Sequence, residues 1–291
     1  MNAETQIFKK FNWQVPKIVA SLPQGEDAKS LYETLNQDIE ANYKNNPNIR
    51  VLSYDPETKS IKGSNIFIAS RLNELLESSG IRTAIPSDDQ YGDISNLVRD
   101  KFYTDFNALI LRTAGDSYSS NDKIAKDIAE KIENREGKLK LPVMIVHPLV
   151  RYSEGSSSYD LVFYLNNKTQ VIEDERLNGK KYSTGMKFNN VDDLGLPLFD
   201  KNGKRTWYVR EDGLSRLGLD GDLVLDSVVG HLTDSFDYRR VVVVSGEAAA
   251  QNFSGLKNYT SRLQAEKAKE IEAIENRYKE ALRILKGNQF R

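Results

Sequence analysis

The 291-residue chain contains no cysteine, only two histidines and no long hydrophobic run. The lack of cysteine excludes disulfides, thiolate nucleophiles, cysteine-ligated zinc and iron–sulfur clusters. No segment approaches the roughly 18 apolar residues of a membrane-spanning helix, so we expect no membrane span. The N-terminal residues lack a basic and then apolar signal peptide, which makes a cytoplasmic location the default expectation. With 41 Lys and Arg against 42 Asp and Glu, the chain also lacks the basic excess typical of nucleic-acid binders.

Familiar catalytic motifs are missing as well. The sequence has no HExxH, GxSxG, GxxxxGK[ST] or GxGxxG, which are the patterns of common hydrolases and nucleotide-binding enzymes. A Ser-His-Asp triad would have to use His147 or His231. His147 lies in the apolar run 141–150, and we interpret it as a histidine at the end of a buried strand. We therefore expect no catalytic residue and no cofactor.

Several acidic groups could in principle perform acid–base chemistry or bind a metal. Asp88-Asp89, Asp192-Asp193 and 173–175 are interpreted as solvated surface charges. Asp220, Asp222 and Asp226 suggest calcium, but an EF-hand loop that began at Asp220 would need Gly and Glu where Leu225 and His231 stand. We interpret Asp222 as an acceptor of local backbone hydrogen bonds and expect no metal site.

Helices are predicted where apolar residues recur at spacings of three and four. Residues 24–46 show such a stripe, and Pro47 follows it. Ser64 is the expected cap of a second helix, which Gly80 ends. Further helices are predicted near 93–105, at 121–135 and at 256–286.

Short apolar runs bounded by turn residues predict strands. Two hairpins are expected, with Asn202-Gly203 typical of a turn in which both residues have positive φ. Alternating leucines after residue 216 predict two strands that break near Gly221. The single strands expected are 49–54, 81–85, 107–112, 141–150 and 241–244, and the two hairpins pair 159–165 with 170–172 and 196–199 with 205–209.

One stretch, 212–246, has an unusual composition. It contains no Lys, Glu, Gln, Met, Trp or Asn, although Lys, Glu and Asn are frequent elsewhere. Regular framework residues alternate there with residues of no consistent chemistry. The framework includes Gly213-Leu-Ser-Arg-Leu217, Leu219, Asp222, Leu223, Leu225 and Arg240-Val-Val-Val-Val-Ser245. The residues between them, here called the variable positions, are Gly218, Asp220, Gly221, Val224, Asp226, Val228, Val229, Gly230, His231, Thr233, Asp234, Phe236, Asp237 and Tyr238.

This pattern resembles the variable region of proteins diversified by diversity-generating retroelements, in particular the archaeal, Nanoarchaeota-type group with a C-type lectin fold. In that family, adenine-directed mutagenesis rewrites asparagine-type codons, which cannot become Lys, Glu, Gln, Met or Trp codons. The segments 64–89 and 195–208 resemble the corresponding upstream parts of the family at lower specificity. In many such proteins the variable region ends the chain, whereas a further helix is predicted after it here.

The resemblance implies an α+β protein with a C-type-lectin-like domain at 49–250, an N-terminal helical arm at 1–48 and a C-terminal helix at 251–291. It implies a binding protein and not an enzyme, with the variable positions presented to an unidentified protein or cell-surface ligand. We expect Tyr238, Phe236 and His231 to contribute most contact area, because aromatic side chains lose little conformational entropy on binding. The sequence does not indicate an oligomeric state.

Two alternatives stay open on the sequence alone. The strand–helix order of the first half suggests an α/β enzyme or binding protein for a small metabolite, such as a nucleotide or sugar phosphate. The absence of a glycine-rich phosphate loop after 49–54 disfavours that interpretation. The second alternative is a scaffold that oligomerises through the helix at 256–286.

Overall fold

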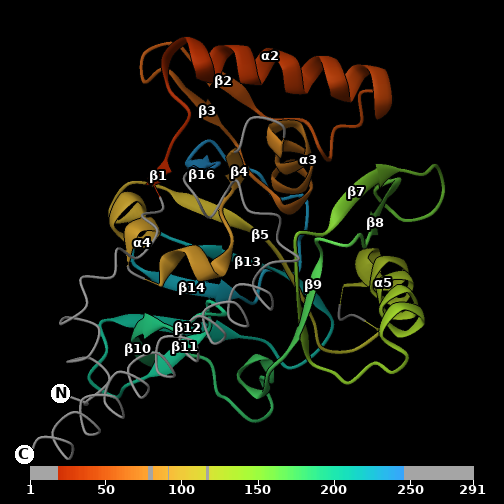
Figure 1. Ribbon diagram of the computed structural model, residues 1–291, viewed down its shortest axis with the longest axis vertical. Helices are drawn as coiled ribbons and strands as arrows, with labels where there is room; N and C mark the ends of the chain where they lie inside the picture. The colour runs from red at the N-terminus through yellow and green to blue at the C-terminus, as the bar shows by residue number, and fades with distance from the viewer. Residues whose placement is uncertain (1–18, 78–80, 91, 116–117, 246–291) are drawn as a thin grey trace, which may run out of the picture. The chain divides into compact units, whose positions relative to one another are not determined.

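Figure 1 shows the computed structural model, which describes residues 19–77, 81–90, 92–115 and 118–245. These residues form a mixed α+β fold with a curled, half-barrel sheet and few helices. The helices are α2 (Gly25–Asn42), α3 (Ile66–Leu76), α4 (Asp93–Val98) and α5 (Asp122–Glu136).

The main sheet has nine strands, most of them antiparallel. Their order is β11-β10-β12-β14-β13-β5-β6-β9, and β15 pairs with β5. The parallel pairs in this sheet are β12 with β14 and β15 with β5. Its strands are β5 (Tyr103–Leu111), β6 (Val143–Val146), β9 (Gln170–Glu173), β10 (Met186–Val191), β11 (Pro197–Phe199), β12 (Arg205–Val209), β13 (Leu214–Leu219), β14 (Val224–Ser227) and β15 (Arg239–Arg240).

The described residues also form three smaller sheets. β1 (Val19–Ser21), β16 (Val243–Ser245) and β4 (Ile81–Thr83) form one antiparallel sheet in the order β1-β16-β4. The other two are the pair β2 (Ser53–Asp55) with β3 (Ser60–Lys62) and the pair β7 (Leu149–Tyr152) with β8 (Leu161–Tyr164).

The central strand pair, β5 with β13, carries the candidate site. All nine residues of β5 and all six of β13 are buried. The pairing runs from Leu214 opposite Leu111 to Leu219 opposite Thr104, with an irregularity between Arg216 and Gly218. Such an irregularity bends a strand and redirects its side chains.

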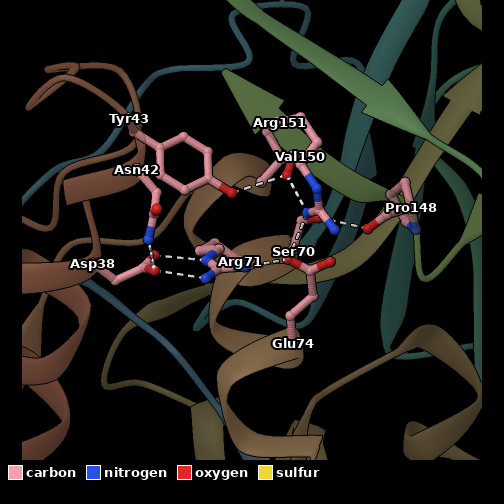
Figure 2. A network of polar contacts seen from close by, with 9 residues as sticks. All are labelled: Asp38, Asn42, Tyr43, Ser70, Arg71, Glu74, Pro148, Val150 and Arg151. Carbon is pink, nitrogen blue, oxygen red and sulfur yellow. Dashed lines mark hydrogen bonds and ion pairs between the residues drawn. The ribbon is translucent and has the colours of Figure 1, made fainter. Parts of the chain in front are cut away.

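A network of polar contacts joins α2 to α3 and β7 (Figure 2). Arg71 of α3 donates two hydrogen bonds of 2.6 Å to the carboxylate of Asp38 on α2. Tyr43, at the end of α2, donates its hydroxyl to the carbonyl of Val150 at 2.9 Å. Glu74 accepts from Arg151 at 2.7 Å. A bidentate arginine–carboxylate pair of this kind fixes geometry as well as adding energy, so α2 is held on the same core as the sheet.

Both predicted hairpins are wrong in their pairing. β8 pairs with β7 and β9 pairs with β6, so the segments around 166–169 belong to two different sheets. β11 and β12 both pair with β10 and flank it. Gly203 does not have a positive φ; an added Cβ there would come within 2.3 Å of the Phe188 carbonyl oxygen, so the glycine permits a close approach to β10.

Other boundaries also differ from the expectations. Asn65, and not Ser64, caps α3, because its side chain accepts a hydrogen bond of 3.0 Å from the Ile68 amide. The run 141–150 is divided at His147, which has φ of 57°, and the run 49–54 contributes only its end to β2. The helix predicted near 93–105 ends at Val98, and β5 begins five residues later. The helix predicted at 256–286 and residues 1–18 lie outside the described residues.

The alternating leucines form the predicted pair of strands. Leu217, Leu219 and Leu225 are at most 1% exposed, and each such burial contributes about 1.5–3 kcal/mol. Leu223 is the exception: it is half-buried, with φ of 62°, because it lies in the turn between β13 and β14. None of the helices within the described ranges of 19–245 has the length and apolarity needed to cross a membrane.

Candidate functional site

An open cleft with a volume of about 730 Å³ lies where the turn after β13, the loop 228–238 and the start of β5 meet. Seven of the fourteen variable positions line it. They are Asp220, Gly221, Asp226, Val229, Asp234, Phe236 and Tyr238. The remaining wall comes from 100–103, Asp222 and Arg239. The cleft is therefore built mainly from the segment with unusual composition.

The loop 228–238 is fixed through its backbone by residues outside the variable positions. Asn65 donates to the carbonyl of Thr233 at 3.2 Å, and Arg216 donates to the carbonyl of Asp234 at 2.7 Å. Asn121 donates to the carbonyl of Gly230. All three donors are at most 1% exposed. Because these bonds end on main-chain oxygens, they hold the loop whatever side chains it carries.

The end of the loop is anchored to β5. The amide of Tyr103 donates to the carbonyl of Tyr238 at 3.2 Å, and Arg239 pairs with Tyr103 in the β15–β5 ladder. Phe236 and Tyr238 are 45% and 51% exposed. Their rings stack with centroids 5.5 Å apart and planes 7° apart. Two large aromatic faces are thus presented at the cleft on a backbone that is held in place.

The turn between β13 and β14 forms another part of the lining. Asp220 accepts a hydrogen bond of 2.8 Å from the Val224 amide, and the carbonyl of Gly221 accepts one of 2.9 Å from the Asp100 amide. The role of backbone acceptor that the sequence suggested for Asp222 therefore belongs to Asp220, and Asp222 is exposed. Asp220 is a variable position that also supports the turn.

Buried charges lie beneath the cleft. Asp105 pairs with Arg216 at 3.0 Å and with Arg239 at 3.3 Å, and all three residues are at most 3% exposed. The guanidinium of Arg239 lies 4.2 Å from the centre of the Tyr103 ring. A buried carboxylate shared by two guanidinium groups is strongly destabilised when one partner is lost. This cluster supports the floor of the site.

Burial alters the acidity of several groups here. It raises the pKa of Asp226 and of Asp220 above the ordinary aspartate value, and the charge of Asp222 adds to the effect at Asp220. Burial, with a contribution from Asp105, raises the pKa of the Tyr103 phenol. At Asp226 the positive charges of Arg216 and Arg239 lower the pKa, but they do not fully compensate its burial.

The structure does not bring all variable positions to this cleft. Gly218 is buried, and a Cβ there would lie 1.9 Å from the Tyr103 hydroxyl. Gly230 is also buried, with room for no side chain beside Tyr118 and Arg210. A side chain at residue 218 would require the Tyr103 ring to move, and one at residue 230 would require Tyr118 and Arg210 to move, so these two positions present no side chain to the cleft.

His231 lies in a different environment. It is exposed, and its ring centroid is 4.6 Å from that of Tyr118. Val224, Val228 and Thr233 are half-buried and Asp237 is exposed, and none of these four residues lines the cleft. Of the three aromatic contacts expected from the sequence, Phe236 and Tyr238 share the cleft and His231 does not.

Sequence reasoning missed one wall of the cleft. Residues 100–103, Asp222 and Arg239 line it, and the first of these segments lies more than 110 residues before the others. The composition of 100–103 is ordinary, so nothing in it signals a site. The β5–β13 pairing, which brings these residues together, is a long-range feature that the local pattern does not encode.

Other candidate catalytic or metal-binding residues form ion pairs and hydrogen bonds within the protein. The sequence predicted that Asp88 and Asp89 are solvated, and this prediction is wrong because both are buried. Asp88 pairs with Arg82, and Asp89 pairs with Arg205 at 2.7 Å. His147 is 3% exposed, its amide donates to the Asn107 carbonyl at 3.0 Å, and its Nδ1 lies 3.3 Å from the Asn107 side-chain nitrogen. Within the described part of the chain, no group of three or more His, Asp or Glu side chains could hold a metal ion.

Comparisons of this chain with family profiles, curated proteins and solved structures gave no match.

Proposed function

We propose that this protein is a retroelement-diversified ligand-binding protein that presents variable side chains around the cleft on a rigid scaffold of C-type-lectin type. The observation that carries the proposal is the anchoring of loop 228–238 through main-chain oxygens. Asn65, Asn121 and Arg216 hold Thr233, Gly230 and Asp234 by their carbonyl groups. Side chains on that loop can change while the backbone keeps its path.

The division of roles supports binding as the function. Framework residues such as Leu217, Leu219 and Leu225 are buried, and their substitution costs stability. Exposed residues such as Phe236 and Tyr238 can be replaced at a cost of about 0.5 kcal/mol each. A fixed backbone also lowers the entropy lost when a ligand binds. The same arrangement supports a binding protein better than an enzyme.

The small-metabolite alternative has less support. It was suggested by a strand–helix order typical of parallel sheets, but the main sheet is mostly antiparallel, and its parallel pairs are β12–β14 and β15–β5. In open parallel sheets, metabolites bind at the carboxyl ends of the strands. The cleft here lies instead at a turn and a long loop.

The test is a library in which Asp234, Phe236, Asp237 and Tyr238 are randomised in the full chain and selected against several unrelated proteins. The proposal predicts folded, specific binders for more than one target. The matched control randomises Tyr164, Leu198 and Tyr208, which are exposed hydrophobic residues elsewhere on the surface, and should give none. Equal yields from the two libraries, or variants that fail to fold, would contradict the proposal.

The origin of the diversity has a separate test. Sequencing the DNA beside this gene should reveal a reverse transcriptase and a near-copy of the codons for 212–246 that differs at adenines. A flanking region without either element would contradict the proposed origin of the diversity. The proposed binding function would still be tested by the library experiment.

A further inference from the structure

The walls of the cleft carry an excess of negative charge. Five aspartates line it among the residues that the structure describes: Asp100, Asp220, Asp222, Asp226 and Asp234. The lining cations are Lys101 and Arg239, and Arg239 is already paired with the buried Asp105. The whole chain has a net charge of only −1, so the acidity is local to the cleft. Such a concave acidic surface attracts cations.

A buried polar group at the same place has no partner. The Tyr103 side chain lines the cleft and is 6% exposed, and its hydroxyl forms no hydrogen bond within the described residues. A buried hydroxyl without a partner costs stability and is rare. The hydroxyl is itself covered by the backbone of Gly218, so Tyr103 lines the cleft through its other atoms.

The stacked rings of Phe236 and Tyr238 are a third feature of this wall. Arg239 already lies 5.4 Å from the centre of the Phe236 ring, so the rings stand in a setting where a guanidinium is accommodated. About half of each side chain is still exposed. Aromatic faces attract cations, and a planar guanidinium can stack on a ring while donating to carboxylates.

We propose that the cleft binds a guanidinium group, presented as an arginine side chain on a protein partner, between the aspartates and the Phe236–Tyr238 pair. This inference rests on the proposed ligand-binding function and specifies the chemical class of the ligand. An organic cation suits the site better than a metal ion, because the aspartates are too dispersed within the described structure to form a metal site. The raised pKa values of Asp220 and Asp226 agree with it, since a bound cation would compensate their burial.

The experiment is an NMR titration of the full chain with three short peptides that differ only at the central residue: arginine, citrulline or glutamate. Citrulline has nearly the shape of arginine without its charge. The proposal predicts shifts of cleft resonances with the arginine peptide and binding at least about tenfold weaker with citrulline. Free methylguanidinium, added separately, shows whether the group alone suffices; weaker binding than that of the peptide supports a protein source, and equal binding overturns the assignment to a protein partner.

Variants localise the effect. Asp226→Asn keeps an oxygen that can accept from the Val228 amide, as Asp226 does at 2.8 Å, and should weaken arginine-peptide binding about fivefold or more. Asp193→Asn, at an exposed aspartate that does not line the cleft, is the matched control and should change nothing. A thermal transition confirms that each variant is folded.

The outcomes separate this inference from the function on which it rests. Equal binding of arginine and citrulline, tighter binding of glutamate, or no effect of Asp226→Asn in a folded protein would overturn the guanidinium assignment. The same would follow if no peptide shifted the cleft resonances. In each of these cases, binders from the randomised library would still support a ligand-binding cleft, and a library without binders would overturn both.

Discussion

The hydroxyl of Tyr103 lies against the backbone of Gly218, so close that a Cβ at residue 218 would be 1.9 Å from it. Gly218→Ala should therefore destabilise the protein by about 1–3 kcal/mol, because the buried Tyr103 ring must shift to make room. Urea unfolding of the variant measures the loss. Gly115→Ala is the control, since nothing lies within 4 Å of a Cβ there. If the two variants unfold at the same midpoint concentration of urea, residue 218 is free to vary.

Asp220 should tolerate one substitution and not another. Asp220→Ala removes the acceptor for the Val224 amide and should cost about 0.5–2 kcal/mol, the range for loss of a side-chain cap. Asp220→Asn keeps an acceptor oxygen and should cost less. Thermal unfolding of both variants at pH 7 gives the comparison. If the two variants lose the same stability, the hydrogen bond to Val224 is not what this side chain contributes.

Asn65 joins α3 to the loop that carries the variable positions. Its oxygen accepts from the Ile68 amide, and its nitrogen donates to the carbonyls of Asn48 and Thr233. Asn65→Asp keeps the cap and loses both donations, whereas Asn65→Ala loses everything. We expect Asn65→Ala to cost about 1–3 kcal/mol, and Asn65→Asp to cost at least as much, because its buried carboxylate would face both carbonyl oxygens without a donor between them.

Hydrogen exchange distinguishes the two roles of Asn65. Asn65→Asp should speed amide exchange in 231–236 more than in α3, because only the donor functions are lost. Asn65→Ala should speed both. Unchanged exchange in 231–236 for both variants would show that the loop is held in place without this residue.

His147 should make stability depend on pH. Burial, with a contribution from the charge of Arg82, lowers the pKa of His147 to about 3, whereas an unfolded histidine titrates near 6.5. Between these values the unfolded state binds the extra proton, so the free energy of unfolding falls as pH falls. The stabilisation is complete above about pH 6.5, and about 2 kcal/mol of it is lost at pH 5.

The measurement is the unfolding free energy at pH 7 and pH 5 for wild type and for His147→Asn. Whatever the substitution costs at pH 7, the loss on acidification should be smaller in His147→Asn than in wild type. His231→Asn, which removes the exposed histidine, is the control. Parallel losses in wild type and His147→Asn would mean that His147 does not titrate between the two pH values.

The sequence predicted features that repeat locally and missed those that depend on distant partners. The leucine alternation was enough to locate β13 and β14, because period-two burial is a local property. The pairing of β8 with β7 was missed, since the turn residues at 166–169 say nothing about which strand lies beside which. Asp88 and Asp89 looked solvated because their partners, Arg82 and Arg205, are recognisable only in three dimensions.

The sequence likewise predicted one part of the candidate site and missed another. The composition of 212–246 pointed to the segment that supplies most of the cleft. It could not separate Phe236, which lines the cleft, from Gly218, which is buried under Tyr103. That difference depends on how closely β5 approaches β13, and the wall at 100–103 depends on the same pairing.

The most direct test of the account replaces three side chains at once, Phe236→Ser, Asp237→Ser and Tyr238→Ser, and measures unfolding in urea. The account predicts one cooperative transition with a loss of about 1.5 kcal/mol or less, because each exposed residue contributes about 0.5 kcal/mol. Leu217→Ser, in the buried framework, should by itself cost more than the three together. A triple variant that unfolds non-cooperatively, or that loses more than Leu217→Ser, would contradict the separation of scaffold from variable surface.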